Sequence, residues 1–229
     1  MKKYKISAFV MVFVLTLFTA CSAPEDISSW SATEVTEKVC RSIEALEGTA
    51  VHLVEKTTMT YSEGSDVVES ERWYADGNCL YIGAQSNGIV TSGLQYNNEM
   101  LTKNSVNNVW SQSKGTASYL PFGAEEGTAQ QFSEEAIASW KVVDGEYCVV
   151  YDLLPEVSEK QKYTVNRTSL YFSEKWELLR VENHAEYSME SWVDGSNTDV
   201  ILDVVIEYQD TSAKKIKSRI EKAYKEANE

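Results

Sequence analysis

The chain has 229 residues, of which 35 are acidic and 21 are basic, and its formal net charge is −14 at pH 7. This charge argues against a nucleic-acid-binding protein, because contacts to phosphate need clustered lysine and arginine. Hydrophobic residues make up 43% of the chain and aromatic residues 11%, which excludes a disordered composition. Only three prolines and eleven glycines are present, so we expect one domain without long flexible linkers.

The first 21 residues have the pattern of a lipoprotein signal. Three lysines, Lys2, Lys3 and Lys5, precede an apolar stretch from Ile6 to Phe18, which is too short to span a bilayer comfortably. Small residues then stand directly before Cys21. We predict that the chain is cut before Cys21, that this cysteine carries the lipid, and that the protein is extracytoplasmic and anchored to the cell membrane. An ordinary secretory signal and an N-terminal transmembrane helix are the alternatives.

This interpretation divides the chain into three parts. Residues 1–20 are the predicted signal peptide, 21–30 a short tether expected to be extended and solvated at its start, and 31–229 one folded domain. A body with this negative charge is repelled by an anionic membrane, so the anchor must hold it there.

The folded part begins with a predicted helix from Ser31 to about Glu47. Ser31 and Glu34 form a capping box, and Gly48 stands where a helix C-terminus favours glycine. The apolar residues of this segment recur at helical spacing and form one stripe: Val35, Val39, Ile43 and Leu46.

From Thr49 the apolar residues alternate with a period of two, which predicts a meander of antiparallel strands. The expected strands are 49–61, 67–75, 79–83, 89–96, 99–103 and 106–112, with turns at Asp76-Gly77, Asn97-Asn98 and Asn107-Asn108. An insert over 113–140 interrupts the meander, and its last eight residues, Ser133–Trp140, predict a short helix. The insert is either a lid or plug, or a plain surface excursion.

Strands resume over 141–154, with a turn at Asp144-Gly145, and continue over 163–172, 177–190 and 199–208. One face of the last strand is entirely apolar and is the candidate ligand lining: Val200, Leu202, Val204, Ile206 and Tyr208. A final helix from Ser212 to about Ala227 carries the only basic cluster of the chain. Its basic side chains form either a solvated face or a face turned toward anionic lipid.

No catalytic or metal-binding motif is present. His52 and His184 have no metal-ligand spacing to another histidine or cysteine, so we predict no metal, no cofactor and no enzymatic activity. Cys40, Cys79 and Cys148 are widely spaced, and either one disulfide with a free thiol or three reduced thiols fits them. No histidine stands near them in sequence to activate a thiolate, so we predict that they are not catalytic.

Three local patterns resemble the LolA/LolB-like lipoprotein-carrier superfamily. These are the strand–turn–strand step of Arg72–Tyr81, the strand-ending Val109-Trp110, and Tyr171-Phe172 followed by Trp176–Leu179. The Arg-Pro step of the soluble carriers is missing, since Trp73 follows Arg72. The resemblance implies an α+β fold, a strongly curved antiparallel β-sheet that forms an incomplete barrel, with helices closing its open side.

Together these features predict a membrane-anchored, non-enzymatic lipoprotein that binds a lipid or another hydrophobic ligand in a cavity of the curved sheet. The alternative is an envelope interaction or signalling module that binds a peptide or protein on its concave face. Neither function involves nucleic acid.

Overall fold

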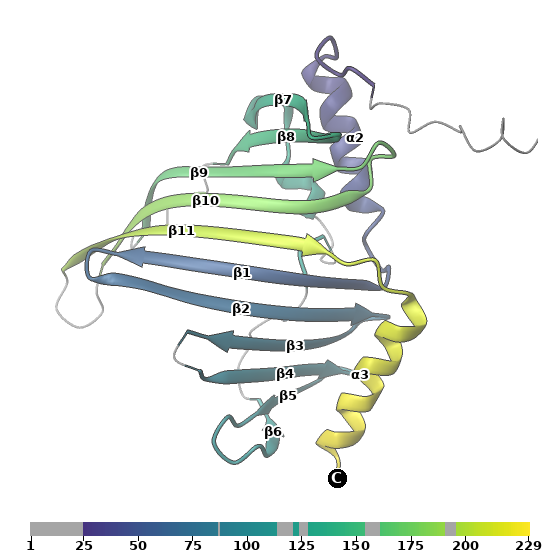
Figure 1. The fold of residues 1–229 in the computed structure, drawn as a ribbon, viewed down its shortest axis with the longest axis vertical. Helices are drawn as coiled ribbons and strands as arrows, with labels where there is room; N and C mark the ends of the chain where they lie inside the picture. Colours follow the sequence, from purple (N-terminus) through teal and green to yellow (C-terminus); the bar gives the residue numbers. More distant parts are fainter. Residues whose placement is uncertain (1–24, 87, 114–120, 124–127, 154–160, 191–195) are drawn as a thin grey trace, which may run out of the picture.

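The fold was taken from a computed structural model that describes residues 25–86, 88–113, 121–123, 128–153, 161–190 and 196–229. The described residues form one antiparallel sheet of eleven strands in the order β6-β5-β4-β3-β2-β1-β11-β10-β9-β8-β7 (Figure 1). Its two ends, β6 and β7, do not pair with each other, so the sheet stays open. The predicted fold class, an α+β fold built on an open antiparallel sheet, is confirmed.

The sheet is built from two meanders that meet in its middle. The first contains β1 (Val51–Tyr61), β2 (Gly64–Ala75), β3 (Asn78–Gln85), β4 (Val90–Tyr96), β5 (Glu99–Lys103) and β6 (Trp110–Gln112). The second contains β7 (Ile137–Val143), β8 (Glu146–Asp152), β9 (Gln161–Phe172), β10 (Leu178–Glu190) and β11 (Asn197–Tyr208). The first and last strands then pair along their length, with Leu53 opposite Tyr208 and Glu55 opposite Ile206.

Three of the four predicted hairpin turns are confirmed by their backbone conformation; at Asn107-Asn108 only Asn108 has positive φ. Asp76-Gly77, Asn97-Asn98 and Asp144-Gly145 all have positive φ at both residues. Two consecutive residues of positive φ are what a tight type I′ hairpin needs, and Asp, Asn and Gly adopt that conformation most easily. These turns set the register between β2 and β3, β4 and β5, and β7 and β8.

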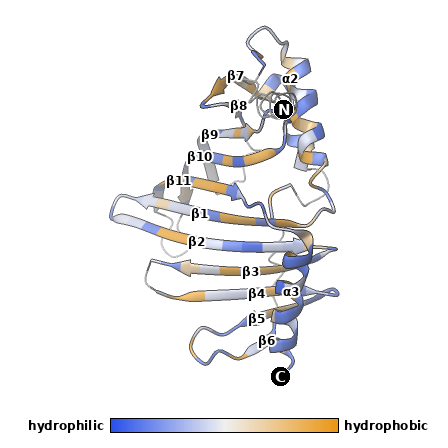
Figure 2. Ribbon diagram, turned by 45° about the vertical axis from the view of Figure 1, so that its right-hand side comes forward, coloured by the Kyte–Doolittle hydropathy of each residue, from blue (hydrophilic) through white to orange (hydrophobic). Residues whose placement is uncertain are grey.

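Two α-helices in the described ranges cover the sheet. The helix α2 (Ala32–Glu44) begins with the predicted capping box, in which Ser31 and Glu34 satisfy each other's backbone N–H groups. It buries Val35, Val39 and Ile43. The helix α3 (Ala213–Ala227) buries Ile216, Ile220 and Ala223. In Figure 2 the largely hydrophilic α3 crosses the first meander, while orange hydrophobic stretches mark β10 and β11.

The two helices pack on opposite faces of the sheet. Residues directly opposite each other in antiparallel strands point to the same face, and consecutive residues of a strand point to opposite faces. The helix α2 packs over the face that bears Leu53 on β1, with Ile206, Val181, Leu170 and Val149 on the following strands. The helix α3 packs over the face that bears His52, with Trp73, Leu80 and Leu94. We call these the α2 face and the α3 face. The implied arrangement, with all helices closing one open side, therefore does not hold for α3.

Two predicted segments need correction besides the strand predicted over 106–112, which begins only at Trp110. The helix predicted over Ser133–Trp140 is wrong beyond Ala136: a single 3₁₀ turn (η2, Glu134–Ala136) leads into β7. Pairing of β7 with β8 outweighs the local helix signal here, as shown by Trp140 lying opposite Val149. The described part of the insert packs into the core through Ala129 and Phe132, so it is not a plain surface excursion.

The predicted tether is the second correction. Glu25 and Asp26 are exposed, but Ile27 is 0% exposed and belongs to the core beneath α2. The side chain of Trp30 stacks on Trp176 at a ring-centroid distance of 5.7 Å. The folded domain therefore begins before the predicted boundary at residue 31, because an isoleucine in this short segment finds an apolar site on the sheet.

Candidate functional site

The five candidate ligand-lining residues of β11 share the α2 face, as predicted. Val204, Ile206 and Tyr208 belong to the same core as the apolar stripe of α2. The Tyr208 hydroxyl donates to the carbonyl of Phe122 in the insert at 2.7 Å, and burial raises the pKa of this tyrosine. Val200 is buried and Leu202 half-buried, both outside that core cluster. Ligand contact at these positions stays a prediction.

A different hollow lies on the α3 face, between the N-terminal half of α3 and strands β1 and β2. Its volume is about 600 Å³, within the range of small-molecule binding sites. We call it the α3 groove. It is lined by His52, Glu71, Trp73, Thr211, Ser212, Lys214, Lys215, Ser218, Arg219 and Lys222.

The floor of the α3 groove is aromatic and rigidly held. His52 and Trp73 lie opposite each other on β1 and β2, and their rings stack at 5.0 Å with an angle of 9° between the planes. The two nitrogens of His52 are both engaged, Nδ1 with the Thr211 hydroxyl at 2.8 Å and Nε2 with a Glu71 carboxylate oxygen at 2.7 Å. Since Trp73 is only 7% exposed, the floor presents a small apolar surface in a fixed position.

The rim of the α3 groove is cationic. The guanidinium of Arg219 lies over the Trp73 ring, 5.3 Å from its centroid, in the geometry of a cation–π contact. In the described part of the chain, Lys214, Lys215 and Arg219 form no ion pair, whereas Lys217, outside the groove, binds Asp76 at 2.6 Å. Lys222 Nζ lies 3.8 Å from a Glu226 carboxylate oxygen, which is a long distance for an ion pair, and both side chains are largely exposed. Three cations with no acidic partner therefore surround the hollow.

This arrangement favours a ligand with a negative group and an apolar portion. A desolvated aromatic surface attracts apolar atoms, and unpaired lysine and arginine side chains attract phosphate or carboxylate oxygens. His52 joins the Thr211 hydroxyl to a Glu71 carboxylate oxygen through its two ring nitrogens, which fixes the imidazole ring beside Trp73.

Sequence reasoning found half of this groove. The sequence predicts the basic run on α3, with anionic lipid as one of two interpretations. It does not predict the floor, because nothing in the local sequence connects His52 with Trp73. The signal that could have found it is the Asp76-Gly77 turn, since fixing the β2–β3 hairpin and its alternation puts Trp73 on the same face as Leu80.

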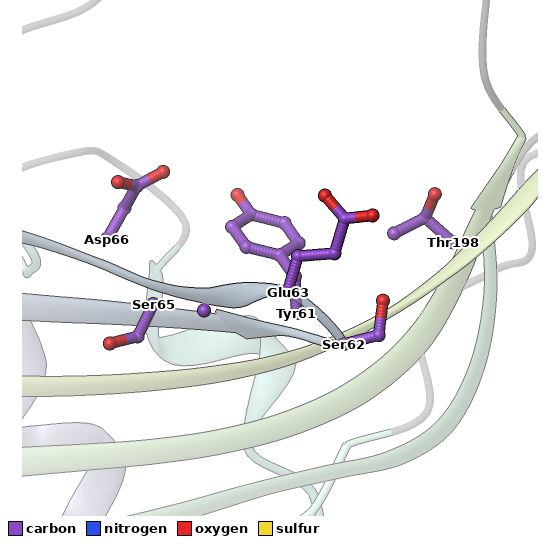
Figure 3. A pocket seen from close by; sticks show the side chains of 7 residues that line it. Tyr61, Ser62, Glu63, Ser65, Asp66 and Thr198 are labelled. Atoms are coloured by element: carbon purple, nitrogen blue, oxygen red, sulfur yellow. The ribbon is translucent and has the colours of Figure 1, made fainter.

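A second hollow, of about 540 Å³, lies at the tip of the β1–β2 hairpin beside Thr198. Figure 3 shows the carboxylates of Glu63 and Asp66 pointing to the same side as the Tyr61 ring. No group of three His, Cys, Asp or Glu side chains suited to a metal ion exists in the described ranges. This acidic tip has no buried, oriented polar group that would mark it as a binding site.

His184 forms a separate polar cluster on the α3 face of β10 and β11. Its Nδ1 lies 2.7 Å from Asp203 and its Nε2 3.3 Å from Glu186. The hydrogen bond with Asp203 raises the pKa of His184, with a smaller contribution from Glu186. All three side chains are substantially exposed, so the cluster is a surface charge network.

Cys40, Cys79 and Cys148 are present as thiols rather than in a disulfide. Burial raises the pKa of Cys79 to about 12, and it also raises the pKa of Cys40 and of Cys148. A raised thiol pKa means little thiolate at neutral pH, so these cysteines are poorly suited to nucleophilic chemistry.

Cys21 and the predicted signal peptide lie outside the described residues. Of the helices in the described ranges, none has the length and apolar character needed to cross a bilayer.

Comparisons with known proteins do not assign a family. No protein-family model and no curated protein matches the chain. Several solved structures align with most of the chain, including the following three. A DUF1329 family protein from Desulfovibrio piger is 8% identical with a TM-score of 0.32, covering 79% of this chain and 92% of its own. The phycobiliprotein lyase CPES from Guillardia theta is 7% identical with a TM-score of 0.30, covering 81% and 96%.

The third is a chain of the Pseudomonas aeruginosa MucA/MucB complex, 10% identical with a TM-score of 0.30, covering 80% of this chain and 96% of that one. At such TM-scores the likeness carries neither ligand nor partner to this chain. The resemblance to the lipoprotein-carrier superfamily therefore remains an expectation, consistent with the open antiparallel sheet.

Proposed function

We propose that this chain is a non-enzymatic binding protein, anchored through a lipid on Cys21 to the outer side of the cell membrane, that binds an anionic amphiphile in the α3 groove. The observation that carries the proposal is the combination of a stacked His52–Trp73 floor with three unpaired cations on the rim. The ligand class stays close to the lipid expected from the sequence, while its site moves from β11 to the α3 groove.

Calorimetric titration with octyl phosphate tests the ligand chemistry, because octyl glucoside offers the same chain with an uncharged head. The full chain is held in a nanodisc of neutral lipid, and an empty nanodisc corrects for partitioning. We expect saturable binding of octyl phosphate and much weaker binding of octyl glucoside. Equal binding of the two compounds would contradict an anionic site.

Two tryptophan substitutions locate the site. Ser218→Trp fills the α3 groove, whereas Leu202→Trp fills space on the α2 face within the candidate β11 lining. Loss of octyl phosphate binding in Ser218→Trp alone supports the α3 groove. Loss in Leu202→Trp alone places the ligand on β11, as the sequence predicted. Absence of binding in the parent protein favours the alternative interaction module.

A matched pair of lysine substitutions isolates the role of charge. Lys215 lines the α3 groove, and Lys225 is an exposed lysine near the C-terminus of the same helix. We expect Lys215→Gln to weaken binding by up to about fivefold, since an exposed ion pair contributes roughly 0.2–1 kcal/mol. Lys225→Gln makes the same change in net charge and should leave binding unchanged.

A further inference from the structure

The segment Glu25–Trp30, which we call the fastened segment, packs on the sheet. The free chain between Cys21 and the folded domain is therefore short. In the fastened segment Ile27 is fully buried, and the carbonyl of Ile27 accepts a hydrogen bond from Trp140 Nε1 at 3.0 Å. The backbone N–H of Glu25 donates to the Tyr147 hydroxyl at 3.0 Å. Only three residues separate Cys21 from Glu25. A fully extended chain of that length reaches about 13–14 Å, so a lipid on Cys21 would hold this part of the domain against the bilayer.

The fastened segment and α3 lie at the same end of the sheet. Tyr147, which binds Glu25, is the second residue of β8 and lies opposite Phe172, the last residue of β9. Asp76, just beyond the last residue of β2, pairs with Lys217 of α3. Figure 1 shows the arrowheads of β9 and β2 pointing to one side of the molecule, where α2 and α3 both lie. A membrane that holds the anchor therefore has α3 on its side of the domain.

The charge distribution favours the same orientation. The helix α3 carries six basic and two acidic side chains in a chain whose formal net charge is −14. An anionic leaflet attracts the helix and repels the rest of the domain. The α3 groove, at about 600 Å³, has room for a head group while the acyl chains stay in the bilayer.

We infer that the ligand of the α3 groove is the head group of an anionic phospholipid that remains in the membrane to which the chain is anchored. This inference rests on the proposed function, since it names the source of the anionic amphiphile. Lys214, Lys215 and Arg219 contact the phosphate and the acidic head group, and Trp73 contacts the glycerol region. The protein then lies on the membrane in one orientation, with the β1–β2 hairpin tip pointing away.

Photo-crosslinking from two exposed serines tests this orientation and the lipid. A small aliphatic diazirine amino acid, which unlike tryptophan leaves room for a ligand, replaces Ser218 in the α3 groove or, as a matched control, Ser62 at the hairpin tip. The lipid-anchored full chain is placed in nanodiscs of phosphatidylcholine alone or with phosphatidylglycerol, and lipid adducts are identified by mass spectrometry. We expect phosphatidylglycerol adducts from position 218, none from position 62, and loss of the adduct when Lys214, Lys215 and Arg219 are changed to Gln.

Each other outcome has a defined meaning. If octyl phosphate binds in the α3 groove but position 218 gives no lipid adduct, the proposed function stands and the membrane source is overturned. Equal adducts from positions 218 and 62 overturn the single orientation. Equal adducts with both lipids overturn recognition of the charged head group. If neither octyl phosphate nor bilayer lipid binds, the proposed function fails together with the inference.

Discussion

Replacing Ile27 with alanine should destabilise the domain strongly, although the sequence places this residue in a tether. The side chain is 0% exposed and packs in the core beneath α2. The substitution removes three carbon atoms, which corresponds to about 2.4 kcal/mol of transfer free energy at roughly 0.8 kcal/mol for each buried methylene. The cavity left behind adds to this, and measured losses for such truncations are about 2–5 kcal/mol.

Urea unfolding of the purified full chain, followed by circular dichroism in one neutral detergent, measures the change. The matched control is Ser28→Ala, whose side chain is exposed in the same segment. We expect the free energy of unfolding to fall by about 2–5 kcal/mol for Ile27→Ala, out of a total of roughly 5–15 kcal/mol for a domain. The control should stay within about 0.5 kcal/mol. A change for Ile27→Ala no larger than that of Ser28→Ala would show that residues 25–30 are a free tether.

Three further predictions concern single residues. Cys79, whose pKa burial raises to about 12, should react slowly with a thiol reagent at pH 7.5 until the protein unfolds; rapid labelling of the native protein would contradict this. The pKa of His184 is raised by Asp203, so its favourable contribution is complete below the ordinary histidine pKa of about 6.5 and is lost as the pH rises through the higher folded value. Relative to His184→Gln, the parent should therefore lose unfolding free energy between acidic and mildly alkaline pH, and parallel pH profiles would refute the pairing. Cys21→Ser should release the protein from membranes or leave an uncleaved precursor, as seen by fractionation; normal processing and retention would rule out the lipid anchor.

Local patterns were sufficient for most of the fold, because antiparallel meanders are defined by nearby residues. The alternating strands and the Asp-Gly and Asn-Asn turns specify each hairpin within a dozen residues. The capping box at Ser31 likewise marks the start of α2. The pairing of β1 with β11 depends on residues about 150 positions apart, such as Glu55 and Ile206. No short-range pattern encodes this contact.

The candidate site was harder to predict, since it combines distant segments on a face that the sequence does not identify. An apolar stripe shows that α3 packs on something, and both faces of the sheet carry apolar residues that accept it. Which face it covers decides whether the cations lie beside Trp73. The burial of Ile27 could not be predicted for a related reason. A single apolar residue among polar ones has no periodicity, and the apolar surface on which it packs is formed only by the folded sheet.

Each helix packs on the meander that is farther from it in the sequence, and this arrangement affects how the protein folds. The helix α2, which precedes the first meander, packs beneath the second, and α3, which follows the second, packs on the first. Neither half of the chain therefore contains all the parts of its own core. A polypeptide synthesised from its N-terminus would expose the apolar face of its first strands until the fifteen residues of α3 had followed. The two cores should then form and melt together, in a single transition, although they lie on opposite sides of the sheet.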